Sequence, residues 1–114
     1  MSAEEMMPVR LEDRKSSTPE PGLLRQVLAT SPDMMLVRHL MESGWVGARH
    51  SHPHEQMVYV ISGHLQFICG DVTFDARTGD SFIVPGGVEH QARALEASEV
   101  LDVFHPYRED YAKS

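Results

Sequence analysis

A chain of 114 residues is long enough to bury one hydrophobic core but too short for two ordinary domains. Its formal net charge of −7 argues against nucleic acid or an anionic membrane as the main partner. No apolar run approaches bilayer length, and the acidic start, MSAEEMMPVRLEDRK, lacks the apolar core of a secretory signal. The single cysteine, Cys69, excludes an internal disulfide, so we expect a cytoplasmic protein.

The chain divides into a polar N-terminal part and a longer part made of short strands. Residues 1–21 predict a flexible arm that ends in a Ser/Pro-rich joint, and residues 22–114 predict one domain. From residue 23, short apolar runs alternate with turn residues, which is the pattern of an all-β sandwich or barrel. The predicted strands cover residues 23–29, 34–41, 46–50, 57–61, 65–69, 72–74, 81–84, 90–94 and 100–104, and residues 109–114 predict a terminal turn.

Three histidines and a glutamine lie at spacings that suit a metal site. His50 and His52 are two residues apart on a strand-like run, so both imidazoles should point to one face. Gln56 follows after a proline, and His90 comes from a separate strand after a Pro-Gly-Gly turn. Three imidazoles and one side-chain oxygen predict a divalent metal ion with coordination positions left for a substrate. The alternative, ordinary hairpin turns, accounts for the glycines but not for the histidine spacing.

These residues fall in two motifs that resemble those of the cupin superfamily. The first reads G-x5-H-x-H-x3-Q-x6-G from Gly44 to Gly63, and the second reads G-x5-P-x-G-x2-H from Gly79 to His90. The resemblance covers roughly residues 22–111 and implies a double-stranded β-helix, which is a jelly-roll barrel. The usual fourth ligand of that family is glutamate, whereas this chain has Gln56.

The glutamine has an electrostatic consequence. A neutral set of three histidines and Gln56 leaves the full double charge of the ion uncompensated. We therefore expect a strong Lewis acid that favours chemistry on a carboxylate or an enolate over dioxygenation. The sequence does not select the ion, and Ni, Zn, Mn and Fe all suit such a site.

The segment 100–111 carries the candidate catalytic groups. In a strand, Asp102 and Phe104 share one face, while Leu101 and Val103 share the other. If the latter pair packs outward, Asp102 and Phe104 point into the barrel beside the metal. Asp102 is then a candidate general acid/base, and Arg108 is a candidate clamp for a substrate carboxylate. The alternative is a solvated aspartate and a surface arginine.

Together with H-x-H-P-H-E-Q, the tail D-x-F-x-P-x-R resembles the small pectin-degradation cupins that linearise unsaturated uronates. That resemblance implies metal ligands at His50, His52, Gln56 and His90, and a substrate pocket lined by Asp102, Phe104 and Arg108. It also implies an isomerase-type enzyme that opens 4,5-unsaturated uronates to linear keto acids. A metal-dependent oxygenase and a non-catalytic small-molecule-binding cupin are the alternatives from other classes.

The remaining expectations concern assembly and the other histidines. Outward apolar residues such as Leu101 and Val103, and open sheet edges, predict a homodimer with strand 23–29 on or near the partner. His54 is interpreted either as a neighbour of the ligands or as a surface residue. Arg49 should point away from the metal, and three further histidines are interpreted as ordinary strand or turn residues: His39, His64 and His105.

Overall fold

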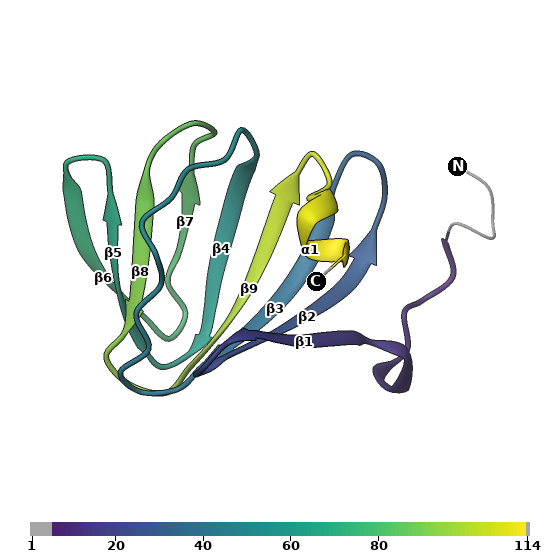
Figure 1. The fold of residues 1–114 in the computed structure, drawn as a ribbon, viewed down its shortest axis with the longest axis horizontal. Helices are drawn as coiled ribbons and strands as arrows, with labels where there is room; N and C mark the ends of the chain where they lie inside the picture. Colours follow the sequence, from purple (N-terminus) through teal and green to yellow (C-terminus); the bar gives the residue numbers. More distant parts are fainter. Residues whose placement is uncertain (1–5, 114) are drawn as a thin grey trace.

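Two antiparallel sheets face each other and form an open barrel (Figure 1). The computed structural model describes residues 6–113, and within them it shows nine strands and a C-terminal helix. These elements are β1 (Lys15–Glu20), β2 (Leu23–Thr30), β3 (Met35–Met41), β4 (Glu55–Ser62), β5 (His64–Cys69), β6 (Val72–Arg77), β7 (Ser81–Val84), β8 (His90–Ala94), β9 (Ser98–His105) and α1 (Glu109–Lys113). The larger sheet has the order β1-β2-β3-β9-β4-β7, and the smaller has the order β6-β5-β8. The predicted all-β fold is confirmed.

One predicted strand is absent and one strand was not predicted. Residues 46–50 form no regular strand and contribute isolated bridges to the smaller sheet instead. Residues 15–20, expected within the flexible arm, form β1 and pair along β2, so the sheet begins before the boundary expected at residue 22. A polar edge strand carries little hydrophobic signal, because its stability comes from backbone pairing with its neighbour rather than from buried side chains.

Alternation along the strands determines which side chains lie inside the barrel. On β9, Asp102 and Phe104 are buried, while Leu101 and Val103 are half-buried on the outer side, as the alternation predicts. The inward side chains form two apolar clusters. The larger contains Leu23, Met41, Val58, Val60, Leu65, Phe67, Ala76, Val84, Ala94 and Val100. The smaller contains Val27, Met35, Val37 and Phe104.

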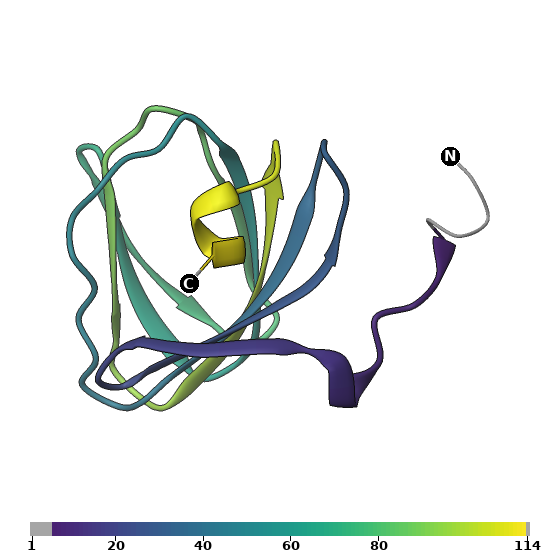
Figure 2. The same cartoon turned by 45° about the vertical axis from the view of Figure 1, so that its right-hand side comes forward.

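The C-terminal segment folds back onto the inner face of the larger sheet. Tyr107, Tyr111 and Ala112 pack against the smaller apolar cluster. Figure 2 looks into the barrel and shows the short helix α1 at its opening. This placement brings residues from the end of the chain to the interior. Within residues 6–113, no helix has the length and apolarity needed to span a bilayer.

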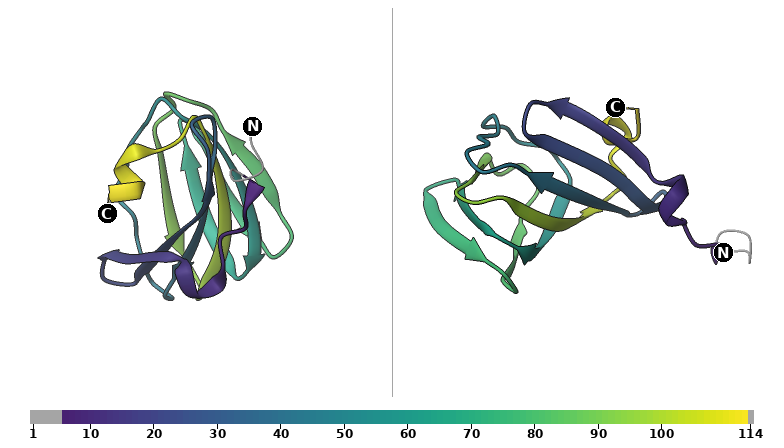
Figure 3. Two further views of the ribbon diagram at one scale, coloured as in Figure 1. Left: turned by 90° about the vertical axis from the view of Figure 1, so that its right-hand side faces the viewer. Right: turned by 90° about the horizontal axis from the view of Figure 1, so that it is seen from below.

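The first described residues lead away from the barrel (Figures 1 and 3). They include a short 3-10 helix, η2 (Leu11–Asp13), none of whose residues is buried. Four apolar side chains of this segment are exposed: Met6, Met7, Val9 and Leu11. We call residues 6–14 the N-terminal arm. Residues 1–5 of the predicted arm and residue 114 of the predicted terminal turn lie outside the described residues.

Candidate metal centre

Backbone hydrogen bonds join the two histidine motifs. The amide of His50 donates to the carbonyl of His90 at 3.0 Å, and the amide of His90 donates back at 2.8 Å. The amide of Gly87 donates to the carbonyl of His52 at 2.8 Å. Gly86 lies so close to the loop of His52 that an added Cβ would collide with a backbone carbonyl oxygen. Gly86 therefore allows the loop of His52 to lie against the turn before β8, and Gly87 adopts the positive φ of 81° in that turn.

The three imidazoles are oriented by their own backbone. Each Nδ1 donates to a carbonyl two residues away, on Ala48 for His50 (2.9 Å), His54 for His52 (3.0 Å) and Val88 for His90 (3.0 Å). A carbonyl only accepts, so each neutral ring carries its hydrogen on Nδ1 and leaves the lone pair of Nε2 free. The candidate ligand atoms of the three histidines lie within 4.8 Å of one another. The structure thus brings together the predicted histidines, although His50 is not on a regular strand.

Burial keeps two of these rings in the form that binds metals. Burial lowers the pKa of His52 to about 4, and the positive charges of Arg108 and His90 act in the same direction. Burial also lowers the pKa of His90. Since a metal competes with protons for the imidazole lone pair, rings with lowered pKa values are available as ligands at neutral pH.

Gln56 extends the group from strand β4. Its Oε1 lies 3.2 Å from Nε2 of His52, and both atoms are acceptors once Nδ1 of His52 carries the ring hydrogen. Two lone pairs that face each other at this distance repel unless a cation lies between them. Two ligand atoms that bind the same metal ion, each at about 2.1 Å from it, are about 3.0–3.4 Å apart from each other. The donor set therefore fits a divalent metal ion.

Asp102 lies behind Gln56, and both of its carboxylate oxygens are engaged. Oδ1 accepts a hydrogen bond from Nε2 of Gln56 at 2.9 Å, and Oδ2 lies 2.7 Å from Nδ1 of His39. The side chain is buried. The sequence predicted that no negative charge of the protein compensates the double charge of the ion. The structure modifies this expectation, because the carboxylate of Asp102 is hydrogen-bonded to the neutral ligand Gln56. The site is less electron-poor than its four predicted ligands alone indicate.

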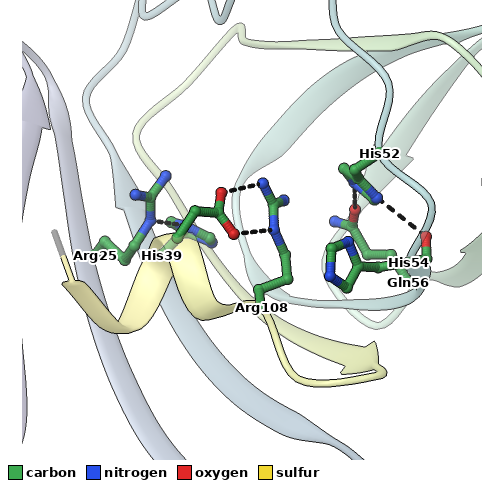
Figure 4. A network of polar contacts seen from close by, with 7 residues as sticks. Arg25, His39, His52, His54, Gln56 and Arg108 are labelled. Carbon is green, nitrogen blue, oxygen red and sulfur yellow. Dashed lines mark hydrogen bonds and ion pairs between the residues drawn. The ribbon is translucent and has the colours of Figure 1, made fainter.

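Phe104 lies inside the barrel, as the alternation along β9 predicts. Arg108 is also buried, and it has a partner that the sequence did not indicate. The Phe104 ring meets the His52 ring edge-on at 5.8 Å between centroids. The buried Arg108 donates to Asp110 through Nε (3.2 Å) and Nη2 (2.6 Å) (Figure 4). Its Nη1 is buried and has no hydrogen-bond partner among residues 6–113. Asp110 thus engages two of the three guanidinium nitrogens, and Nη1 is the one without a hydrogen bond among the described residues.

Two residues of this site were missed by the sequence analysis. His39 is buried and contacts Asp102, so its interpretation as an ordinary strand residue is wrong. The signal was present, because His39 shares its side of β3 with the apolar residues Met35, Val37 and Met41. Arg25 donates from Nε to Nε2 of His39 at 3.0 Å (Figure 4). Only the pairing of β2 with β3, which sets Arg25 opposite His39, reveals this contact.

The side chains of His54, His64, His105 and Arg49 are not in the group of candidate ligand atoms, although the His54 ring meets the His52 ring at 5.5 Å between centroids. His54 supports His52 through its backbone carbonyl, whereas its own Nδ1 has no partner among the described residues. Arg49 pairs with the exposed Glu89 at 3.0 Å and points away, as predicted. Nε2 of His64 lies 3.5 Å from a carboxylate oxygen of Asp75 on the smaller sheet, and His105 is exposed.

A model of the cupin domain matches residues 37–104, which is more than half of the chain. The chain is a cupin. The matched region of this cupin begins within β3 and ends at Phe104, so it contains the four predicted ligands and Asp102. Arg25, Arg108 and α1 lie outside it.

This cupin is also similar to individual proteins. It is 30% identical over 92 residues to the pectin degradation protein KdgF of Dickeya dadantii (strain 3937). The matched residues cover 79% of this chain and 84% of that protein. The structure of KdgF from Halomonas sp. superposes with a TM-score of 0.84 at 33% identity and covers 91% of this chain and 98% of that one. An RmlC-like cupin from Shewanella frigidimarina gives a TM-score of 0.84 at 32% identity, with coverages of 90% and 92%.

Proposed function

We propose that this cupin binds one divalent metal ion through His50, His52, Gln56 and His90 and linearises small unsaturated uronates. The observation that carries the proposal is a cavity of about 300 Å³ in which several functional groups meet. Its lining includes predicted metal ligands, a buried carboxylate and two guanidinium groups: His50, Gln56, His90, Asp102, Arg25 and Arg108. Likeness to KdgF proteins over most of the chain supports a substrate from pectin.

The residues of the cavity divide the chemistry among them. A bound divalent ion supplies Lewis acidity toward a substrate carboxylate and its neighbouring oxygen. Arg108, whose Nη1 has no hydrogen-bond partner among residues 6–113, is the group we assign to the substrate carboxylate. Phe104 is buried against the His52 ring and, contrary to the expectation from the sequence, is not among the residues that line this cavity. Asp102 lies beside the ligand Gln56 and is the group we assign to proton transfer.

The proposed reaction is an isomerisation without loss or gain of atoms. The hemiacetal hydroxyl at C1 of the sugar loses its proton, and the bond between C1 and the ring oxygen breaks. The ring oxygen becomes the hydroxyl of an enol at C5. That enol then loses its O–H proton and takes a proton at C4, which gives a linear keto acid with an aldehyde at C1. Asp102 is the residue that accepts and returns the proton.

The test is an absorbance assay on purified, metal-analysed protein. The conjugated double bond of an unsaturated uronate absorbs in the ultraviolet, and its conversion to a ketone removes this absorbance. We expect protein that contains stoichiometric metal to accelerate the loss, and protein stripped with a chelator not to do so. Metal-loaded protein that leaves every unsaturated monouronate unchanged would contradict the proposed activity.

Replacing Arg108 separates substrate binding from proton transfer. We expect Arg108→Met to raise KM with a smaller effect on kcat, because the lost contact holds the carboxylate before and during the reaction. Steady-state kinetics with Arg77→Met, a change on the exposed end of β6, provide the control. An unchanged KM, or an equal loss in kcat and kcat/KM, would contradict this role.

A second copy of the chain is the partner we propose. The outer face of the larger sheet carries a contiguous apolar patch, because Met57 lies opposite both Ile83 and Val103, and Tyr59 lies opposite Leu101. Met57, Tyr59 and Ile83 are 52%, 48% and 47% exposed. The N-terminal arm also exposes four apolar side chains. A self-complementary interface that covers both features closes a symmetric dimer and removes them from water.

A charge introduced into this patch should disrupt the dimer. We expect the unmodified protein to be a dimer at micromolar concentration, and Met57→Glu to be a monomer by light scattering. Val72→Glu is the matched control, because Val72 is 58% exposed but lies on the smaller sheet. A monomeric unmodified protein, or a dimer that tolerates Met57→Glu, would refute the interface.

The free Cys69 supports the further proposal that the protein works in a reducing compartment such as the cytoplasm.

A further inference from the structure

A line of four polar side chains crosses the inner face of the larger sheet. Arg25, His39, Asp102 and Gln56 come from the neighbouring strands β2, β3, β9 and β4 in that order. The links measure 3.0 Å from Arg25 to His39, 2.7 Å from His39 to Asp102 and 2.9 Å from Gln56 to Asp102. The line runs along the boundary between the two apolar clusters of the core. Polar groups in such a place must satisfy one another.

The donors and acceptors of this line permit one arrangement. A guanidinium only donates, so Nε2 of His39 accepts from Arg25, and the hydrogen of the neutral ring is on Nδ1. That hydrogen is donated to Oδ2 of Asp102, whose carboxylate only accepts. Gln56 must then offer its NH₂ group to Oδ1, which turns its Oε1 toward His52.

We infer that Arg25 and His39 are positioning residues that, through Asp102, make Gln56 an oxygen ligand. An amide has an oxygen end that binds metal ions and a nitrogen end that does not, and the two ends have nearly the same shape. Packing alone therefore cannot select the end that faces the three imidazoles. The hydrogen-bond line that selects it begins at Arg25, three strands away from Gln56 in the sheet order. This inference rests on the metal site of the proposed function.

The inference predicts what happens when Asp102 is replaced by asparagine. Asn has one accepting and one donating end, so exactly one link of the line is mismatched. If the mismatch lies between His39 and the new side chain at position 102, moving the ring hydrogen of His39 from Nδ1 to Nε2 would restore that hydrogen bond. The hydrogen on Nε2 would then face the N–H group of Arg25, which also only donates. Turning Gln56 over is the alternative, and it removes the oxygen ligand. If Arg25 is also changed to methionine, His39 is free to move its hydrogen and Gln56 keeps its orientation.

The experiment measures Zn²⁺ affinity by chelator competition and the visible spectrum of bound Co²⁺. We expect Asp102→Asn to lower the Zn²⁺ affinity by about 10–100-fold and to change the Co²⁺ spectrum. In an Arg25→Met background, the same change should have little effect on either readout. In a Gln56→Ala background, it should have no further effect, because the oxygen ligand is already absent. Thermal melting of each metal-free variant checks that it is folded.

The outcomes distinguish this inference from the proposed function. An equal loss of affinity in all three backgrounds would show that Asp102 acts on the ion by its charge and not through Gln56, and would overturn the inference alone. A similar Co²⁺ spectrum for the unmodified protein and for Gln56→Ala would also overturn it. Unmodified protein that binds neither Zn²⁺ nor Co²⁺ would instead reject the metal site of the proposed function. Turnover is not a readout in any of these arms.

Discussion

Asp102→Asn is expected to lower kcat on an unsaturated uronate by about 10²–10⁴-fold, the usual contribution of a positioned acid/base. The carboxylate is buried and accepts a hydrogen bond from the predicted ligand Gln56. The other carboxylate that lines the cavity, Glu20, accepts a hydrogen bond from Trp45. An amide at this position cannot accept and return a proton. Because the three histidines are unchanged, the variant should still bind the ion when metal is in excess.

The measurement must separate lost chemistry from lost metal. Turnover is therefore compared at metal concentrations that saturate each variant, with metal content determined on the same samples. Asp75→Asn is the control, because its carboxylate is half exposed on the smaller sheet and lies near His64 rather than near the ligands. If metal-saturated Asp102→Asn turned over substrate at the normal rate, the proton transfer would have to be assigned to another group.

His52→Ala is expected to remove tight metal binding and with it all measurable turnover. His52 is a buried ring with a lowered pKa, its Nδ1 is held by a carbonyl, and its Nε2 faces Gln56. Its loss removes one of the four predicted ligands. Loss of a ligand should weaken binding by at least the roughly 10–100-fold typical of changes in the groups that merely support ligands.

His54→Ala is the matched control for this change. His54 is two residues away and also carries an imidazole, but it contributes its backbone carbonyl to the site, and alanine keeps that carbonyl. We expect metal content by elemental analysis to fall in His52→Ala and to be retained in His54→Ala. Equal metal content in the two variants would remove His52 from the ligand set.

The sequence was sufficient to predict that His50 and His52 lie together, because side chains two residues apart in extended chain point to the same side. Alternation in extended chain placed His50 and His52 together, and a turn rich in glycine brought His90 to them. The same alternation put Asp102 and Phe104 inside and Leu101 and Val103 outside. The directions of these side chains follow from alternation along one extended segment. The approach of His90, in contrast, depends on its backbone pairing with His50.

Other features depended on pairs of segments that are far apart in the sequence. β1 was missed because an edge strand is held by its neighbour and has no apolar face of its own. Arg108 is buried because the C-terminal segment folds back into the barrel, where Tyr107 and Tyr111 pack against residues of β2, β3 and β9. Neither packing event leaves a periodic pattern in the sequence.

The sequence by itself determined the all-β class, the shared direction of His50 and His52, and the inward side of β9, since each follows from spacing along one chain segment. Only the tertiary structure decided that Arg25, His39, Asp102 and Gln56 form one line. The reason is physical: strand order and register set which inward side chains touch, and β2-β3-β9-β4 is not their order in the chain. The hydrogen bonds that link these four side chains therefore exist only once the strands have paired in this order and register.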